Sequence, residues 1–279
     1  MKKLFASFMC TVVIALTVFC VPFNAQAAEY TPNVKIYADA YMLISLDDDS
    51  HPVVAQKNAD KRKYPASLTK IFTAMVTLNK GKDLSQETVA SKTAIESIYG
   101  TGAQVAGLKI GKSYTIEELL YLTMVYSACD ACEVLAEFVS GSIPAFVDEM
   151  NSWVQFIGCK DTHFVNPDGL HDPEHYTTAS DMAKITIEAM KNDVFNKISS
   201  TQQYKFGNLN LIHTNYMLDK FHITYYYQYA QGIKTGSTEE AGYCVITKAS
   251  KGGYNYLAIV MDSPIEVLDG IKTKCSFID

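Results

Sequence analysis

The chain has 279 residues, a formal net charge of −6 at pH 7, and hydrophobic side chains at 48% of its positions. This acidic balance argues against a nucleic-acid partner, which calls for extended basic surfaces. The length and apolar content are those of a globular protein with one large domain, or a domain with a subdomain.

The first 27 residues have the pattern of a secretory signal peptide. Two lysines after Met1 form a positive n-region, residues 4–23 are almost wholly apolar, and the tripeptide ending at Ala27 is a small-residue cleavage site. An uncleaved anchor is the alternative. We therefore expect an exported protein whose folded part is residues 28–279.

The cysteines give no sign of a disulfide framework. Five lie beyond the expected leader: Cys129, Cys132, Cys159, Cys244 and Cys275. An odd number of cysteines spread widely along the chain does not indicate a framework of disulfides. Cys129 and Cys132 have the CxxC spacing of redox and zinc sites, but no second Cys or His pair has matching spacing. We expect two thiols on one helical face.

The N-terminal third of the folded part begins with a predicted hairpin and a helix. Strand-like segments at 41–46 and 52–56 flank a polar turn. A helix is then expected to begin at Pro65, because apolar residues follow at helical spacing, and Gly81 is expected to end it.

From about residue 84 to residue 200 the pattern is mainly helical, which predicts a helical subdomain. Thr115 and Glu118 form a capping box before an apolar helical stretch. Further helices are expected at 131–139, 143–156 and 180–190.

Strand periodicity returns after Tyr225. Strands are expected at 232–237, 242–249 and 256–261, with a glycine turn between the last two. Strands at both chain ends with helices between them predict an α+β fold, in which both termini build one antiparallel sheet flanked by helices.

Ser67 is the only serine with a lysine three residues later, Lys70. A serine hydroxyl becomes a good nucleophile when a base removes its proton, and residues three apart on a helix share a face. We expect burial and the charge of Lys234 to lower the pKa of Lys70, which would make it that base. The alternative is a capping serine followed by a surface lysine.

Lys234-Thr235-Gly236 is a second motif, on an expected strand and followed by Ser237. The lysine offers charge, and the threonine a hydroxyl donor, to a substrate carboxylate. Glycine leaves room for a substrate backbone along the strand edge. The alternative is a lysine before a turn.

Ser127 supplies a third element. A second hydroxyl in the cleft can relay a proton to a leaving amine. The alternative is a helix N-cap, with Asp130 in the first helical turn.

In this order the three motifs resemble those of the serine D-alanyl-D-alanine carboxypeptidases, peptidase family S11, which are low-molecular-mass penicillin-binding proteins. The resemblance runs from about Tyr41 to the C-terminus. It is carried by Lys57-Asn58-Ala59-Asp60, Tyr64-Pro65-Ala66-Ser67-Leu68-Thr69-Lys70, Phe164-Val165-Asn166-Pro167-Asp168-Gly169-Leu170, His175-Tyr176-Thr177-Thr178-Ala179, Gly232-Ile233-Lys234-Thr235-Gly236 and Ala241-Gly242-Tyr243-Cys244. It implies a fold like that of β-lactamases and DD-peptidases.

The resemblance implies a role for each matching residue. Ser67 would be acylated, Lys70 would be its base, and Ser127 would relay the proton. The strand motif from Lys234 to Gly236 would hold the terminal carboxylate of a peptide. The backbone N–H groups of Ser67 and Ser237 would form the oxyanion hole.

The implied substrates are peptidoglycan stem peptides ending in D-Ala-D-Ala, with β-lactams as covalent inhibitors. The implied place of action is the cell-wall side of the bacterial membrane. We expect no cofactor and no metal.

The sequence departs from the family at two places. Cys129 stands where the family usually has asparagine, whose amide contacts the substrate and braces the lysine; a thiol is a poorer donor. We expect penicillin acylation to persist, with reduced or shifted peptide turnover. Within these 279 residues we also expect no C-terminal β-rich domain and no membrane-binding tail.

Three rival interpretations follow. A β-lactamase would add a glutamate-led ExxLN loop, and the nearest match is the helical segment 188–192. A penicillin-binding sensor or inactive homologue would keep the cleft without turnover. A zinc peptidase would need a helical histidine pair, but Pro173 separates His171 from His175 and no HExxH occurs.

Overall fold

The computed structural model describes residues 32–80 and 83–279. The expected signal peptide and Gly81 lie outside these residues. Within them, no helix is both long enough and apolar enough to span a bilayer.

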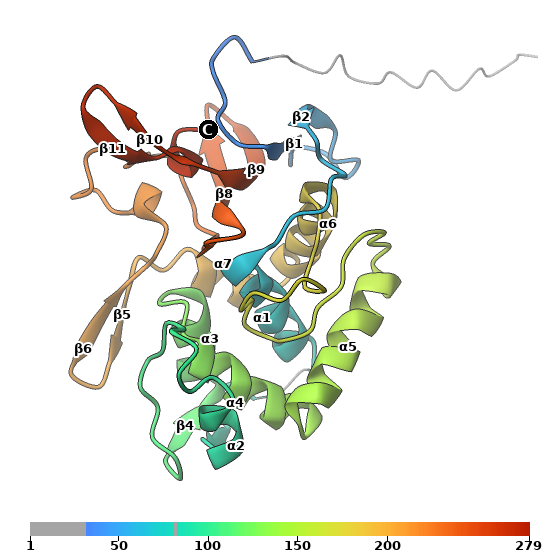
Figure 1. Cartoon of the computed structure of the whole chain (residues 1–279), viewed down its shortest axis with the longest axis vertical. Coiled ribbons are helices and arrows are strands. Elements are labelled where there is room, and N and C mark those ends of the chain that lie inside the picture. Colours follow the sequence, from blue (N-terminus) through green and yellow to red (C-terminus); the bar gives the residue numbers. More distant parts are fainter. Residues whose placement is uncertain (1–31, 81–82) are drawn as a thin grey trace, which may run out of the picture.

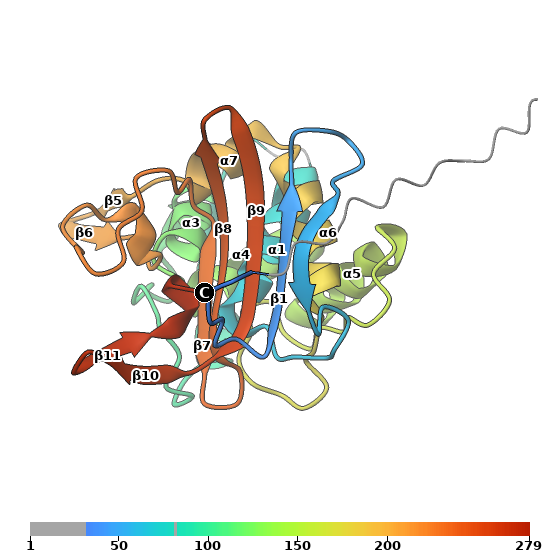
Figure 2. The same ribbon diagram turned by 90° about the horizontal axis from the view of Figure 1, so that it is seen from above.

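A five-stranded antiparallel sheet is built from both ends of the chain, as expected (Figure 2). Its strands are β1 Ala40–Ser45, β2 Val53–Lys57, β7 Lys234–Thr238, β8 Gly242–Lys251 and β9 Tyr254–Ser263. Their order is β2-β1-β9-β8-β7, and every neighbouring pair is antiparallel. β7, which carries the lysine-threonine-glycine motif, is therefore an edge strand.

The helices gather on one face of this sheet (Figures 1 and 2). They are α1 Thr69–Asn79, α2 Lys92–Glu96, α3 Ile116–Met124, α4 Cys129–Ser140, α5 Ile143–Phe156, α6 Ala179–Met190 and α7 Asp193–Ser199. α6 packs on β1 and β9, and α1 packs between α6 and the α3–α4 pair. The prediction of an α+β fold is confirmed.

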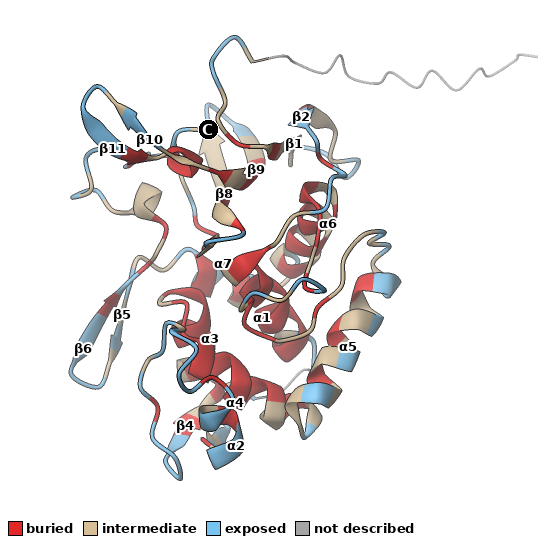
Figure 3. Cartoon of the chain, viewed as in Figure 1, coloured by how far each residue is buried: buried red, intermediate tan, exposed pale blue. Residues whose placement is uncertain are grey.

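The most deeply buried helix is α1, in which residues 69–77 are all buried (Figure 3). Its central position explains the apolar spacing in the sequence, and it also encloses the polar side chains of Lys70 and Thr73. A buried ammonium needs partners, because water cannot solvate it. The polar side chains of Lys70 and Thr73 therefore need hydrogen-bond partners within the protein core.

Ser67 lies in a 3₁₀ turn, η1 Ala66–Leu68, that precedes α1, rather than in the first turn of the α-helix. The helices expected at 131–139, 143–156 and 180–190 correspond to α4, α5 and α6. The capping box of Thr115 and Glu118 is present at α3.

Three two-stranded antiparallel sheets were not predicted. They are β3 Glu87–Val89 with β4 Ser113–Thr115, β5 Gln203–Phe206 with β6 Leu209–Ile212, and β10 Ile265–Leu268 with β11 Ile271–Lys274. The short turns η2 Tyr216–Leu218 and η3 Cys275–Phe277 accompany them. A small apolar cluster around Tyr225 and Phe277 packs on Val245 and Val260, away from the main core.

Candidate active site

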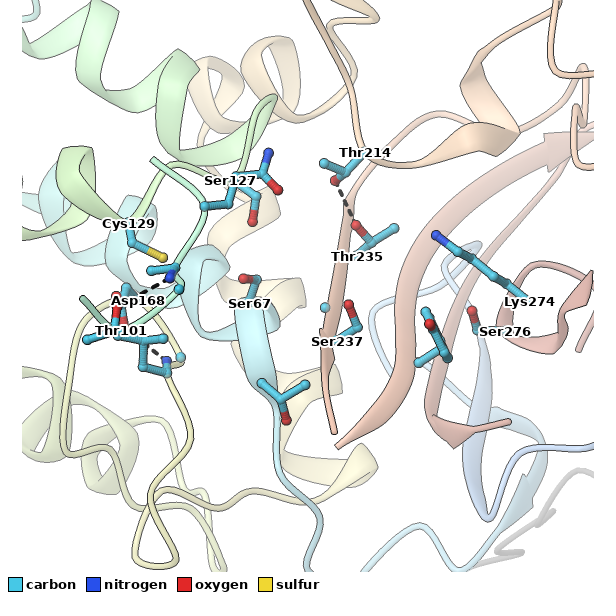
Figure 4. A pocket seen from close by; sticks show the side chains of 18 of the residues that line it. Ser67, Thr101, Ser127, Cys129, Asp168, Thr214, Thr235, Ser237, Lys274 and Ser276 are labelled. Atoms are coloured by element: carbon cyan, nitrogen blue, oxygen red, sulfur yellow. Dashed lines mark hydrogen bonds between the residues drawn. The ribbon is translucent and has the colours of Figure 1, made fainter. Parts of the chain in front are cut away.

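A cavity of about 470 Å³ opens where η1, the start of α4 and β7 meet. Ser67, Ser127, Thr235 and Ser237 all line it, so three segments far apart in sequence converge, as Figure 4 shows. Lys70 and Lys234 lie just beneath its floor, and both are completely buried.

Lys70 is placed to act on Ser67. Its Nζ lies 3.0 Å from Ser67 Oγ and also donates to the backbone oxygen of Asp168 at 2.5 Å. A third contact runs to Cys129 Sγ at 3.3 Å. These three acceptors, from η1, α4 and the loop after Pro167, fix the amine beside the hydroxyl.

Lys234 and Ser127 form a second hydrogen-bonded pair. Lys234 Nζ donates to Ser127 Oγ at 2.9 Å and to the backbone oxygen of Thr235 at 2.9 Å. The capping interpretation of Ser127 is wrong, because the N-cap of α4 is Ala128 and Ser127 has a left-handed φ of 64°. That uncommon backbone conformation turns the hydroxyl toward Lys234.

Gly236 is required by the protein's own backbone. A Cβ added there would lie 2.8 Å from Pro65 O and 3.0 Å from Ser67 N. The glycine therefore lets β7 approach η1 closely, a role that the sequence did not predict. This approach sets the width of the cleft between the nucleophile and the strand edge.

Cys129 occupies a buried position between Lys70 and Asp168. Burial raises the pKa of its thiol to about 12, so the sulfur is protonated at neutral pH. Asp168 Oδ1 accepts from the N–H of Leu170, whereas Oδ2 is buried without a hydrogen-bond partner. An asparagine at position 129 would offer that oxygen an amide donor.

The two lysines differ in pKa in a way that the sequence did not predict. Burial opposes the charge on Lys70, whereas the nearby carboxylate of Asp168 favours it and helps to keep the pKa of Lys70 above that of Lys234. Burial and the positive charge of Lys70 lower the pKa of Lys234 to about 7. The expectation that Lys234 would depress Lys70 is therefore reversed in the free protein.

Several residues of the cavity were not predicted from the sequence. Thr214 accepts a hydrogen bond from Thr235 Oγ1 at 2.6 Å, and its N–H donates to Val125 O. Lys274 extends from β11 toward β7 (Figure 4), with its Nζ 5.1 Å from the Tyr216 ring centre. No periodic pattern marks these loop and hairpin residues, so only the fold reveals them.

Lys274 carries a positive charge without a countercharge. Its Nζ also lies 5.4 Å from the ring centre of Tyr243, and burial lowers its pKa. It forms no ion pair with any carboxylate in the described part of the chain. A half-enclosed cation of this kind suits an anionic group of a ligand.

The wall opposite β7 is a loop that α4 holds in place. Asp130 accepts from the backbone N–H groups of Ala106, Gly107 and Leu108 at 2.8–2.9 Å. The N–H of Cys129 donates to Gln104 O at 2.8 Å. Asp130 thus positions the loop and does not cap with Ser127.

The features that suggested rival enzymes lie outside the cavity. Segment 188–192 ends α6, and Glu188 pairs with Lys191 on the surface. His175 is buried with its Nε2 2.8 Å from Thr69 Oγ1. Across residues 32–80 and 83–279, no group of three His, Cys, Asp or Glu side chains is arranged to hold a metal ion.

The tyrosine run 225–227 does not line the cavity. Tyr225 packs against Phe277 with ring centres 4.9 Å apart, and its neighbours are partly exposed. Tyr225 is therefore a packing residue of the apolar cluster with Phe277.

The comparisons with known proteins agree with the cleft chemistry. The family model described as D-alanyl-D-alanine carboxypeptidase, Peptidase_S11, matches residues 24–264. The chain is 32% identical over 268 residues to D-alanyl-D-alanine carboxypeptidase DacF of Bacillus subtilis, covering 93% of this chain and 66% of that protein. It is 33% identical over 261 residues to DacA of Escherichia coli, covering 88% and 63%.

The chain is also similar to solved structures of related proteins. The Streptomyces K15 DD-transpeptidase matches with a TM-score of 0.77 at 28% identity, covering 84% of this chain and 93% of that one. Penicillin binding protein 5 from Haemophilus influenzae matches with a TM-score of 0.75 at 30% identity, covering 84% and 67%. The chain thus spans slightly less than two thirds of the DacF and DacA sequences. It belongs to the D-alanyl-D-alanine carboxypeptidase family, peptidase family S11.

Proposed function

We propose that the protein is a serine DD-carboxypeptidase that removes the terminal D-alanine from peptidoglycan stem peptides and is acylated by penicillin. The observation that carries the proposal is the 3.0 Å contact between Lys70 Nζ and Ser67 Oγ inside the cavity. In this role Ser67 Oγ attacks the carbonyl carbon between the two D-alanines, and the amide C–N bond breaks. Water then hydrolyses the ester and frees the shortened stem.

Binding of the terminal carboxylate prepares the base. The carboxylate would lie beside Lys234 and the hydroxyl of Thr235, with Lys274 as a further cation. Negative charge next to Lys234 favours the ammonium form of that lysine. Because the two buried ammonium groups repel each other, a proton held on Lys234 favours the neutral amine at Lys70. The substrate itself would thus place the neutral amine next to Ser67.

Proton transfer and charge stabilisation complete the cycle. Lys70 takes the proton from Ser67, and Ser127, held by Lys234, is placed to deliver a proton to the leaving amine. The N–H groups of Ser67 and Ser237 would bind the oxyanion. Each such donor contributes on the order of 3 kcal/mol to transition-state stabilisation.

The proposed location follows from the substrate. Stem peptides are found in the peptidoglycan, so we propose that the protein is exported and acts on the cell-wall side of the bacterial membrane. The leader-like sequence of residues 1–27 supports this proposal.

Two measurements test the function. Mass spectrometry after benzylpenicillin treatment should find one adduct on Ser67, and Ser67→Ala should show none. A synthetic pentapeptide ending in D-Ala-D-Ala should release D-alanine with wild type only. Labelling without D-alanine release would favour a penicillin-binding sensor, and rapid penicillin hydrolysis would favour a β-lactamase. An adduct on another residue would refute the assignment of the nucleophile.

A further inference from the structure

The turn that carries the nucleophile has an uncommon backbone conformation. Ala66, the residue before Ser67, has a left-handed φ of 47°, which residues with a side chain rarely adopt. Such a conformation persists only where the surrounding structure holds it. The contacts that hold it meet at one peptide unit, the one that joins Ala66 to Ser67.

The two ends of this peptide unit face different parts of the structure. A Cβ added to Gly169 would lie 1.9 Å from Ala66 O, so the carbonyl faces the loop after Pro167. A Cβ added to Gly236 would lie 3.0 Å from Ser67 N, so the nitrogen lies against β7. Because a peptide unit is planar, a contact that fixes its carbonyl also fixes the direction of its N–H.

Thr69 fixes the carbonyl with two hydrogen bonds. Its backbone N–H donates to Ala66 O, and its side-chain hydroxyl donates to the same oxygen at 2.9 Å. A hydroxyl has one proton to donate and can also accept. Since the proton of the Thr69 hydroxyl is directed at Ala66 O, the hydroxyl oxygen can accept a hydrogen bond from a second group.

That second group is the imidazole of His175. Its Nε2 lies 2.8 Å from Thr69 Oγ1, and its Nδ1 accepts from the backbone N–H of Val165 at 3.1 Å. A neutral imidazole has one N–H, so the contact with Val165 places the proton on Nε2. Burial lowers the pKa of His175 to about 3, so the ring is neutral at neutral pH. The hydrogen bonds therefore run from His175 through Thr69 to Ala66 O.

We propose that His175, acting through Thr69, orients the Ala66–Ser67 peptide unit so that the N–H of Ser67 points at the oxyanion formed in the cleft. This inference rests on the proposed function, in which that N–H binds the oxyanion. His175 is buried and is not among the residues that line the cavity, so it is a positioning residue. Hydrogen bonds in a chain strengthen one another, so loss of the imidazole donor would loosen the carbonyl that Thr69 holds.

Substitutions at two positions separate this role from packing. In His175→Gln the amide nitrogen can take the place of Nε2 and still donate to Thr69. In His175→Asn the shorter side chain can accept from the N–H of Val165 but does not reach Thr69. Thr69→Val removes the hydroxyl, and Thr69→Ser keeps it. Thr77→Val is the matched control, because Thr77 is a buried threonine of α1 whose hydroxyl donates to Thr73 O.

Two measurements separate binding in the transition state from binding in the ground state. Stopped-flow acylation by benzylpenicillin gives the dissociation constant of the first complex and the rate constant of acylation separately. A boronic acid adds to the serine hydroxyl as a tetrahedral anion, so its inhibition constant reports on the oxyanion hole. Thermal unfolding shows whether each variant is folded.

We expect His175→Asn and Thr69→Val to lower the acylation rate constant about tenfold, less than the cost of losing a whole oxyanion donor. The boronic acid should bind these two variants about tenfold more weakly, and the dissociation constant of the first penicillin complex should stay within about twofold of wild type. His175→Gln, Thr69→Ser and Thr77→Val should be acylated within about threefold of the wild-type rate.

A wild-type acylation rate in Thr69→Val, or equal losses in His175→Gln and His175→Asn, would overturn the inference. A loss confined to the dissociation constant, or an equal loss in Thr77→Val, would also overturn it, because either result indicates a structural role alone. If His175→Asn does not fold, the comparison of Thr69→Val with Thr69→Ser decides. Failure of wild type to form a penicillin adduct on Ser67 would instead overturn the proposed function.

Discussion

Lys70 Nζ lies 3.3 Å from Cys129 Sγ, so a protonated thiol braces the amine beside the nucleophile. A thiol is a weak acceptor and offers one weak donor. An asparagine amide would accept from Lys70 through its oxygen and donate to the unpartnered Oδ2 of Asp168 through its nitrogen.

Cys129→Asn should raise the free energy of unfolding by about 1 kcal/mol, because a buried carboxylate oxygen gains a donor. It should also raise D-alanine release from the pentapeptide, with penicillin acylation changed less. Urea unfolding and the two rate assays measure these effects. Cys132→Asn is the control, because that thiol contacts Thr123 and Ala128 rather than Lys70. Lower D-alanine release by Cys129→Asn would show that the cysteine is an adaptation.

Acylation by benzylpenicillin should become faster as the pH rises through about 7. Below that pH both buried lysines are charged; above it Lys234, whose pKa burial and the charge of Lys70 lower to about 7, loses its proton in the free enzyme. Binding of the penicillin carboxylate would draw the one remaining proton to Lys234 and leave Lys70 neutral. The methyl ester of benzylpenicillin lacks the carboxylate that binds the Lys234 ammonium. Acylation by the ester should therefore be slower and should depend less on Lys234. Stopped-flow acylation between pH 6 and pH 9 compares the two. Identical profiles would contradict the role of Lys234 as carboxylate ligand.

Glu133 makes the stability of the protein depend on pH. Burial, together with the charge of Asp168, raises the pKa of this carboxyl to about 9 from an ordinary 4.5, although Lys70 opposes the shift. Between those values the native state keeps a proton that the unfolded chain loses. The free energy of unfolding therefore falls as the pH rises through this window.

Glu133→Gln should remove that dependence. We compare the free energy of unfolding of the variant with that of wild type. From pH 5 to pH 8 we expect this difference to shift in favour of the variant by on the order of 1–2 kcal/mol. Urea unfolding at both pH values gives the difference. Glu137→Gln, one turn along α4 and less buried, should change with pH as wild type does. A wild-type pH dependence in Glu133→Gln would show that this carboxyl is not the source.

Gly236→Ala should separate β7 from η1. The added methyl group would meet Pro65 O at 2.8 Å and Ser67 N at 3.0 Å, so the strand must shift. We expect a loss of about 1–3 kcal/mol in the free energy of unfolding and much slower penicillin acylation. Ser237→Ala, at the exposed next position, should keep wild-type stability within about 0.5 kcal/mol. Normal stability and acylation in Gly236→Ala would contradict the close approach.

The sequence predicted the elements whose side chains repeat regularly. The alternation of residues in β8 and β9 and the helical spacing in α5 and α6 gave their positions to within a few residues. Ser67, Lys70, Ser127 and Lys234 were also predicted, because each belongs to a motif with fixed spacing. Their convergence is confirmed.

What the sequence did not predict depends on contacts between distant segments. The β10–β11 hairpin is short, and only its position brings Lys274 to the cavity. The lower pKa of Lys234 depends on its burial and on the charge of Lys70, and the two lysines meet only in the folded protein. Asp130 was placed correctly in the first turn of α4, but its hydrogen bonds to the loop at 106–108 were missed because that loop is distant in sequence.

The hydrogen bond between Thr214 and Thr235 has a topological consequence. It ties the edge strand β7 to a segment that also donates to Val125 O on the helical side. The protein's own hydrogen bonds therefore hold the two walls of the cleft together at this point. Under the proposed function, the end of a peptide chain would bind beside this fixed point.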